Sequence, residues 1–192
     1  MKKTAETQVP LLSEIAERWS PRAYDTTYAV SNEELVAVLE AGRWAPSANN
    51  LQPWRFSVVT RGEDLHTQIV AEAMSGFNAA WVPNASKIIF ISIPSTNQDG
   101  NPYEIAKFDA GLAAQNMMTQ AQALGLATHP ISGYNHDTVS KLLGLEEGRN
   151  SIAAIVLGKS TSPDTLPGPA HEREIAPRTR LSLEEIVLHG LN

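Results

Sequence analysis

The segment Lys87-Ile88-Ile89-Phe90-Ile91-Ser92-Ile93 carries the strongest secondary-structure signal in the chain. Its side chains are mostly β-branched and apolar, which favours an extended strand over a helix. Apolar residues do not alternate with polar ones, so neither face of this strand is expected to meet solvent. The segment therefore predicts the central strand of a sheet that other elements cover on both faces.

Further strands and helices are expected on both sides of this strand. A chain of 192 residues is long enough for one domain with a sizeable core, and we expect a single domain over residues 1–192. Ser31, with Glu34 at the capping-box position, marks the start of one helix. The other expected strands are Arg55–Val59, Ala127–Ser132 and Ser151–Leu157, and the expected helices are Leu11–Trp19, Ser31–Arg43, Leu65–Met74, Glu104–Leu124 and Asp137–Leu143. This order of elements predicts an α+β domain.

Two parts of the chain suggest contact with a second subunit. The expected helix Glu104–Leu124 carries many small residues, including Ala110, Gly111 and Ala114, which permit close helix packing. That face suits either the core of the domain or a subunit interface. The stretch from Ser160 to Pro177 is rich in proline and shows no clear periodicity. We therefore expect residues 160–192 to form an extended tail that crosses to a partner subunit.

The composition argues against several classes of protein. A formal net charge of -6 is unfavourable for binding nucleic acid. The chain has no cysteine, which removes disulfides and thiolate metal sites, and its five histidines show no metal-binding spacing, so we expect no metal site. The N-terminus lacks an apolar signal core, and no run approaches the roughly 20 apolar residues of a membrane span. A cytoplasmic location is therefore expected.

The loop Pro46-Ser47-Ala48-Asn49-Asn50 stands between an expected helix and an expected strand. Short hydroxyl and amide side chains between Pro46 and Pro53 cannot continue the helix. They suit a rigid loop that presents backbone and short polar groups to a flat ligand. An ordinary helix-to-strand turn explains the same composition equally well.

Two windows near the ends of the chain concentrate arginine. They are Arg18-Trp19-Ser20-Pro21-Arg22 and Arg178-Thr179-Arg180, each with a hydroxyl residue between its arginines. Guanidinium groups next to a hydroxyl provide the charge-assisted hydrogen bonds that a phosphate monoester needs. Either window alone can also be a solvated surface patch. The chain has no glycine-rich dinucleotide fingerprint, no Walker loop and no G-x-S-x-G nucleophile motif.

Taken in order along the chain, these motifs resemble the nitroreductase family of flavin-dependent oxidoreductases. The resemblance runs from about Glu14 to Leu183, and the Pro46 loop is its most specific part. The matching segments are Arg18-x-Ser20-x-Arg22, Pro46-Ser47-Ala48-x-Asn50-x-Gln52-Pro53-Trp54, Asn78, Asp109-x-Gly111 with Gln115-Asn116, Pro130-Ile131-Ser132-Gly133 and Arg178-x-Arg180. The resemblance implies a three-layer α/β/α sandwich with a mixed, mainly antiparallel central sheet, in an intertwined homodimer.

The same resemblance implies flavin mononucleotide (FMN) as the cofactor, bound where two subunits meet. The residues implied for its phosphate and ribityl chain are Arg18, Ser20, Arg22, Arg178 and Arg180, with Trp19 among them. The flavin ring would be lined by four residues of the second subunit, the partner's Pro46, the partner's Ser47, the partner's Ala48 and the partner's Asn50. Asn78 would also contact the cofactor. The flavin edge is expected along Pro130, Ile131, Ser132 and Gly133, with backbone amides near Ser132 and Gly133 approaching N5 and no catalytic side chain.

The implied activity is hydride transfer from NAD(P)H to FMN and then to a small acceptor, such as a nitroaromatic or a quinone, in a ping-pong cycle. A flavin that carries the hydride chemistry also explains why no acid/base pair stands out in the sequence. Aldehyde or enone reduction, flavin rearrangement, and flavin storage without efficient turnover remain alternatives. Neither the physiological acceptor nor a preference for NADH or NADPH follows from the sequence.

Three features depart from the family pattern. Ala48 stands where many members have a second serine, which removes one hydroxyl beside the ring. Ser132 stands where some members have an acidic residue, which alters the surroundings of the flavin edge. The connection from Ile93 to Tyr103 is short, so the substrate pocket is expected to be more open than in larger members.

Overall fold

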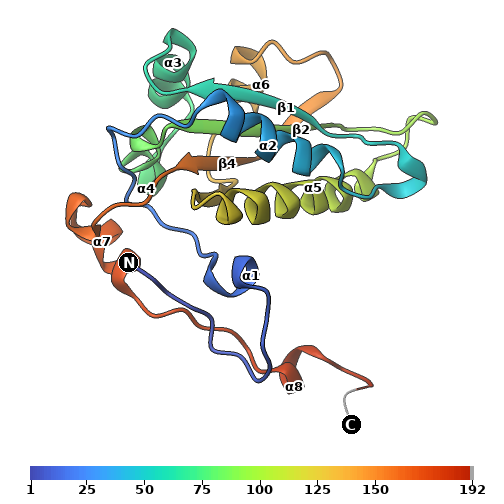
Figure 1. Cartoon of the computed structure of the whole chain (residues 1–192). Helices are drawn as coiled ribbons and strands as arrows, with labels where there is room; N and C mark the ends of the chain where they lie inside the picture. The colour runs from blue at the N-terminus through green and yellow to red at the C-terminus, as the bar shows by residue number, and fades with distance from the viewer. Residues whose placement is uncertain (191–192) are drawn as a thin grey trace.

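The computed structural model describes residues 1–190 and is built around a four-stranded sheet (Figure 1). The strands are β1 (Arg55–Thr60), β2 (Lys87–Pro94), β3 (Ala127–Ile131) and β4 (Arg149–Gly158). They lie in the order β1-β2-β4-β3, and all three pairings are antiparallel. The apolar strand β2 therefore has a partner on each edge, as its sequence predicts.

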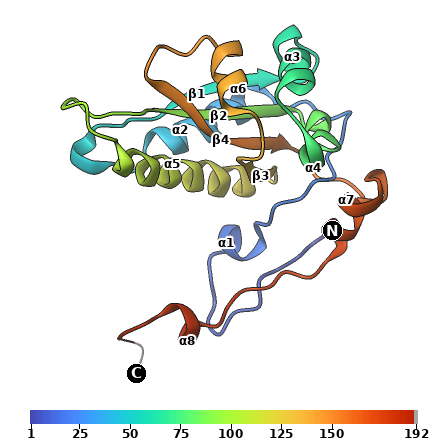
Figure 2. The same cartoon turned by 180° about the vertical axis from the view of Figure 1, so that it is seen from behind.

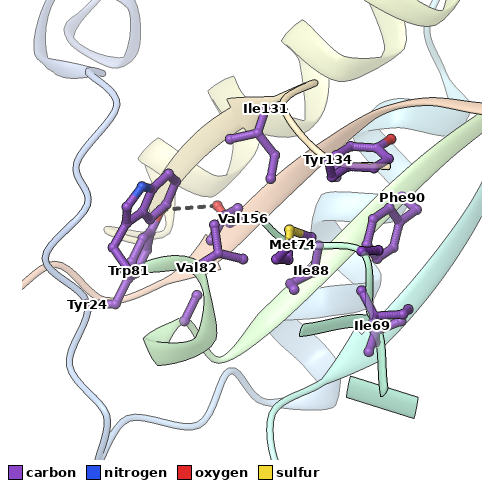
Figure 3. Packing of buried hydrophobic residues seen from close by; sticks show 14 of the residues in the cluster. Tyr24, Ile69, Met74, Trp81, Val82, Ile88, Phe90, Ile131, Tyr134 and Val156 are labelled. Atoms are coloured by element: carbon purple, nitrogen blue, oxygen red, sulfur yellow. Dashed lines mark hydrogen bonds between the residues drawn. The ribbon is translucent and has the colours of Figure 1, made fainter. Parts of the chain in front are cut away.

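Alternate residues of β2 enter two separate hydrophobic clusters, one on each face of the sheet. Ile88 and Phe90 pack with residues of α3 (Asp64–Glu72) and α6 (His136–Leu142), and Figure 3 shows part of this cluster. Ile89 and Ile91 pack with α2 (Asn32–Arg43) and α5 (Glu104–Ala123) on the other face. Burial on both faces explains why β2 has no polar stripe. The result is a three-layer α/β/α sandwich.

The helices agree with the sequence where an apolar face or a cap marks them. The capping box of α2 forms, because the Ser31 backbone N–H donates to the Glu34 carboxylate while the Ser31 hydroxyl accepts the Glu34 N–H. α1 is shorter than expected, and several short elements carry no clear sequence signal. α1 spans Ser13–Glu17, and the elements without a clear signal are η1 (Ala48–Asn50), α4 (Gly76–Ala79), η2 (Val82–Asn84), η3 (Pro163–Thr165), α7 (Gly168–Ile175) and α8 (Leu183–Ile186).

The C-terminal tail is attached to its own domain before it extends. Leu166 and Ala170 are buried in the same cluster as Phe90, so η3 and α7 cover the chain's own core. Beyond residue 176 the tail leaves the sandwich alongside the N-terminal segment, and α8 lies at its far end (Figures 1 and 2). Whether this arm crosses to a partner stays a prediction.

Side-chain hydrogen bonds join the N-terminal and C-terminal arms. The Arg178 Nη1 donates to the carbonyl oxygens of Lys3 and Ala16, at 2.6 and 2.8 Å. The Lys3 ammonium donates to the carbonyl oxygens of Glu174 and Ala176.

Among residues 1–190, no helix has both the length and the apolar character needed to cross a bilayer.

Candidate functional site

The two arginine windows of the sequence meet where the N-terminal and C-terminal arms run side by side (Figures 1 and 2). Burial lowers the pKa of Arg18, and the neighbouring charges of Arg178 and Arg180 lower this pKa further. No ion pair within residues 1–190 gives any of these three guanidinium groups a carboxylate partner. Arg18, Arg178 and Arg180 thus form a basic cluster. A cluster of like charges without a counter-charge favours an anionic ligand.

Arg22 is fixed beside this cluster by a buried acid. The Glu174 carboxylate, in a residue only 2% exposed, accepts the backbone N–H groups of Arg22 and Ala23 at 2.8 and 3.2 Å. It also lies 3.9 Å from the Arg22 Nη1. The Arg22 Nε is buried and has no hydrogen-bond partner in residues 1–190. A buried donor without an acceptor is unfavourable, so a polar ligand fits this place.

Burial and charge also affect the histidine beneath the first arginine window. The His129 Nδ1 lies 2.9 Å from the carbonyl oxygen of Pro21, and its ring packs 4.5 Å from the buried Trp81 ring. Burial lowers the pKa of His129 to about 4, and the charges of Arg22 and Arg18 act in the same direction. The ring is therefore neutral at pH 7 and does not add to the positive charge of the site.

Asn78 connects the basic cluster with the expected flavin edge. The guanidinium of Arg22 lies 5.4 Å from the Phe77 ring, and the next residue, Asn78, donates its side-chain N–H to the Gly133 carbonyl at 3.0 Å. A Cβ on residue 133 would lie only 2.9 Å from the Asn78 Nδ2. A Cβ at position 133 would therefore displace the Asn78 side-chain amide.

The segment after β3 presents mainly backbone to the surface. Ile131 is 7% exposed and belongs to the core, whereas Pro130, Ser132 and Gly133 are exposed. A ligand placed here meets backbone amides and short side chains. This arrangement is compatible with the expected backbone contacts to flavin N5, which stay a prediction.

The Pro46–Asn50 loop and the first arginine window lie near opposite ends of strand β4. Arg149, at the start of β4, donates from its Nη1 to the Pro53 carbonyl at 3.1 Å. By contrast, Tyr24 near the first arginine window pairs with Ser160, just beyond the end of β4. The ten residues of β4 separate the two places by roughly 30 Å of strand. The structure therefore does not bring the loop to the basic cluster within one chain.

This loop is nevertheless held in a defined conformation. The Ala48 N–H lies 3.2 and 3.3 Å from the two carboxylate oxygens of Asp109, which is buried in α5. The Ser47 hydroxyl accepts the Gln52 N–H at 3.0 Å. Asn49 and Asn50 have φ values of 50° and 57°, a region that asparagine tolerates better than most residues. The loop is thus more constrained than an ordinary turn.

Trp19 lies at the edge of the site and faces the N-terminal arm. The Lys3 ammonium is 4.6 Å from the centroid of its ring.

Residues 1–190 contain no group of three His, Asp or Glu side chains able to hold an ion. The basic cluster, Asn78 and Ser132–Gly133 are therefore the elements of the candidate site in one chain.

Sequence reasoning missed the buried residues that position this site. Glu174, Asp109 and His136 each hold a backbone segment that the motifs contain. Asp109 was noticed only as part of a helix motif, and Glu174 looks like a surface residue beside Glu172 and Arg173. Their partners lie 152, 61 and 4 residues away in sequence. No local pattern could have identified the two long-range pairs.

Comparison with known proteins identifies the family of this chain. The model of the nitroreductase family matches residues 15–87 and 67–159. An oxygen-insensitive NADPH nitroreductase of Helicobacter acinonychis is 32% identical over 148 residues, which are 75% of this chain and 66% of that protein. A solved oxidoreductase containing FMN is 32% identical, covers 97% of this chain and 94% of its own, and superposes with a TM-score of 0.87. A Desulfovibrio desulfuricans protein solved with FMN is 29% identical, with coverages of 97% and 99% and a TM-score of 0.73.

The fold and these comparisons define the class of protein, an FMN-dependent oxidoreductase with an α/β/α fold. The chain belongs to the nitroreductase family. The family, the fold and the enzyme class predicted from the sequence are confirmed.

Proposed function

We propose that the protein is an FMN-dependent oxidoreductase that takes hydride from NAD(P)H and reduces a small acceptor, such as a nitroaromatic or a quinone, in a ping-pong cycle. The observation that carries this proposal is a group of guanidinium side chains without a carboxylate partner in residues 1–190, next to Arg22. From Arg22, Phe77 and Asn78 lead to the Ser132–Gly133 backbone. A phosphate bound by the arginine side chains and a flavin edge at the Ser132–Gly133 backbone would match the two functional ends of FMN.

The residues present fit FMN better than FAD. Arg18, Arg22 and Arg180 offer donors to one terminal phosphate, and the buried Arg22 Nε still lacks an acceptor within residues 1–190. The chain has no glycine-rich turn for a pyrophosphate. The FMN-containing relatives support the same choice. When bound, FMN would supply the hydride-transfer chemistry, and the protein would bind and orient it.

We also propose that the working unit is a homodimer. The Pro46–Asn50 loop is held rigidly by Asp109 but lies far from the basic cluster of its own chain, so it is available to a partner's site. Large apolar side chains are exposed near this loop and along the C-terminal arm. They include Trp44 (75%), Leu51 (52%), Phe108 (63%), Leu181 (65%) and Leu188 (83%). Exposed apolar surface of this extent is typical of an interface.

The experiment that tests the proposed function starts with the purified full-length protein. We expect a flavin absorbance spectrum, and heat release followed by chromatography should identify FMN as the main species. Anaerobic NADPH should bleach the flavin, and nitroaromatics or quinones should restore its colour. FAD as the main species would contradict the cofactor assignment. FMN that NAD(P)H does not reduce would instead favour a storage module, and re-oxidation only by aldehydes or enones would favour a specialised activity.

A cytoplasmic location stays a prediction.

A further inference from the structure

His136 occupies an unusual position between two backbone carbonyl groups. Its Nδ1 lies 2.8 Å from the carbonyl oxygen of Ser151, and its Nε2 lies 2.9 Å from the carbonyl oxygen of Ser132. The ring therefore connects the first turn of α6 with β4 on one side and with the predicted flavin edge on the other.

The β4 side of this connection is rigid. Ser151 is 1% exposed, its hydroxyl lies 2.7 Å from the Tyr134 hydroxyl, and its backbone N–H donates to the Ser140 hydroxyl at 3.1 Å. The Ser140 hydroxyl in turn donates to the His136 carbonyl at 2.8 Å. The Tyr134 ring also packs 4.3 Å from the His136 ring. With its ring held in this way, His136 has little freedom, so its contact with Ser132 is well defined.

The contact with Ser132 fixes more than one carbonyl group. In a trans peptide the C=O of one residue and the N–H of the next point in opposite directions. The peptide bond between Ser132 and Gly133 is trans, so orienting the Ser132 carbonyl toward His136 also orients the Gly133 N–H away from it. Gly133 is exposed, and its N–H has no hydrogen-bond acceptor within residues 1–190.

We propose that His136 is a positioning residue, which aims the Gly133 N–H at the bound cofactor by holding the Ser132 carbonyl. This inference rests on the proposed function, because the acceptor for that N–H is the edge of FMN. A neutral imidazole carries one N–H, so with its proton on Nε2 the ring donates to the Ser132 carbonyl and not to that of Ser151, whereas the doubly protonated ring donates to both. His136 touches no reacting atom in this scheme and acts only through the Ser132–Gly133 peptide.

Two other contacts hold the same turn without replacing His136. The Tyr134 N–H donates to the Ser132 carbonyl at 3.1 Å, and the Asn78 side chain donates to the Gly133 carbonyl at 3.0 Å. The first belongs to the turn itself and moves with it. The second holds the following peptide group. Within residues 1–190, only His136 holds the Ser132 carbonyl through a side chain, so removing its Nε2 should release this peptide group specifically.

Two substitutions distinguish the contact of His136 with Ser132 from its contact with Ser151. The amide nitrogen of asparagine lies about as far along its side chain as Nδ1, whereas that of glutamine lies about as far as Nε2. His136→Asn should therefore place its amide N–H beside the Ser151 carbonyl and lose the bond to Ser132. His136→Gln should keep the bond to Ser132. Both variants retain a polar amide, so a general loss of packing should affect them similarly.

The orientation of the peptide can be observed directly in the FMN-loaded full-length protein. The dipeptide Ser-Gly occurs twice in the sequence, at Ser75–Gly76 and at Ser132–Gly133. Carbonyl-¹³C serine combined with ¹⁵N glycine therefore gives two coupled signals, and the first pair serves as the internal reference. We expect His136→Asn to shift the Ser132 carbonyl and Gly133 amide signals, and His136→Gln to leave them near their wild-type positions.

The same variants should differ in stopped-flow reduction by NADPH at matched flavin occupancy. Losing one orienting hydrogen bond should slow flavin reduction by about 2- to 12-fold in His136→Asn, with His136→Gln within about twofold of wild type. An unshifted Ser132–Gly133 signal with an unchanged rate in His136→Asn would overturn the inference. Equal impairment of both variants would also overturn it, because the ring would then act through packing. Wild-type protein without FMN would instead refute the proposed function.

Discussion

The carboxylate of Glu174 accepts the backbone N–H of Arg22 at 2.8 Å, which ties α7 to the first arginine window. Its second oxygen accepts the Ala23 N–H, and the Arg22 guanidinium lies 3.9 Å away. With 2% exposure, Glu174 is shielded from water that could replace these bonds. The bonds that orient Arg22 therefore come from the C-terminal part of the chain.

Replacing Glu174 should destabilise the protein. Glu174→Ala would leave two backbone N–H groups without their acceptor, each costing about 1–3 kcal/mol, so the free energy of unfolding should fall by about 2–6 kcal/mol. Chemical denaturation measures this change. The exposed neighbour Glu172→Ala is the matched control and should stay within about 0.5 kcal/mol of wild type. Equal stability of both variants would show that Glu174 does not hold the motif.

Removing single arginines should weaken FMN binding. Arg22→Ala and Arg180→Ala each delete a charge-assisted hydrogen bond worth about 1.5–3 kcal/mol, so FMN affinity should fall roughly 10- to 150-fold. Flavin fluorescence during titration of the stripped protein gives the dissociation constant. Thr161→Ala removes a hydroxyl beside the first window but leaves the Thr161 N–H bond to the Ala23 carbonyl in place, so it should be nearly neutral. Full flavin occupancy in the purified arginine variants would identify the windows as solvated patches.

Acidification should destabilise the protein through His129. Its pKa is about 4 in the folded state and about 6.5 when unfolded, so the unfolded chain binds more protons between these values. The stability it contributes is therefore complete above pH 6.5 and is lost as the pH falls toward 4. Between pH 7 and pH 5 the loss should be about 2 kcal/mol.

Two variants isolate this contribution. His129→Asn retains an N–H donor for the Pro21 carbonyl without titrating in this range, so its unfolding free energy should fall less between pH 7 and pH 5. His171→Asn changes a partly exposed ring 3.7 Å from Asp164 and should keep the wild-type dependence on pH. Identical pH profiles for wild type and His129→Asn would contradict the assignment.

Substitutions at the flavin edge should affect the backbone more than the side chains. Ser132→Ala should leave the rate of flavin reduction within about tenfold, a barrier change below ~1.4 kcal/mol. Gly133→Val should be far more harmful, because a Cβ there would lie 2.9 Å from the Asn78 Nδ2 and displace that contact. Stopped-flow reduction by NADPH at matched flavin occupancy compares the two. A Ser132→Ala enzyme slowed a thousandfold would make the hydroxyl itself catalytic.

The proposed dimer predicts that association and cofactor retention are linked. Light scattering should give about twice the 20.8 kDa mass of the chain, and dilution that produces monomers should also release FMN. Phe108→Glu on the exposed face of α5 should shift the equilibrium toward monomers, whereas Lys107→Glu beside it should have little effect. A stable monomer that retains its FMN would refute the dimer proposal.

The sequence by itself determined the layers of this protein. The unbroken apolar run of β2 requires cover on both faces, and the capping box of α2 fixes where that helix begins. These signals are local, because they depend on the spacing of residues within one strand or one helical turn. The motifs of the arginine windows, the Pro46 loop and the Ser132–Gly133 segment were likewise visible without coordinates.

Only the tertiary structure decided which of these motifs meet. It brings Arg18 beside Arg178 and Arg180, and it keeps the Pro46 loop at the far end of β4. It also shows that Glu174 and His136, which no motif marks, hold the backbone of the site. The physical reason is that a buried hydrogen bond depends on distance in space, and residues 152 positions apart share no local pattern that could predict it.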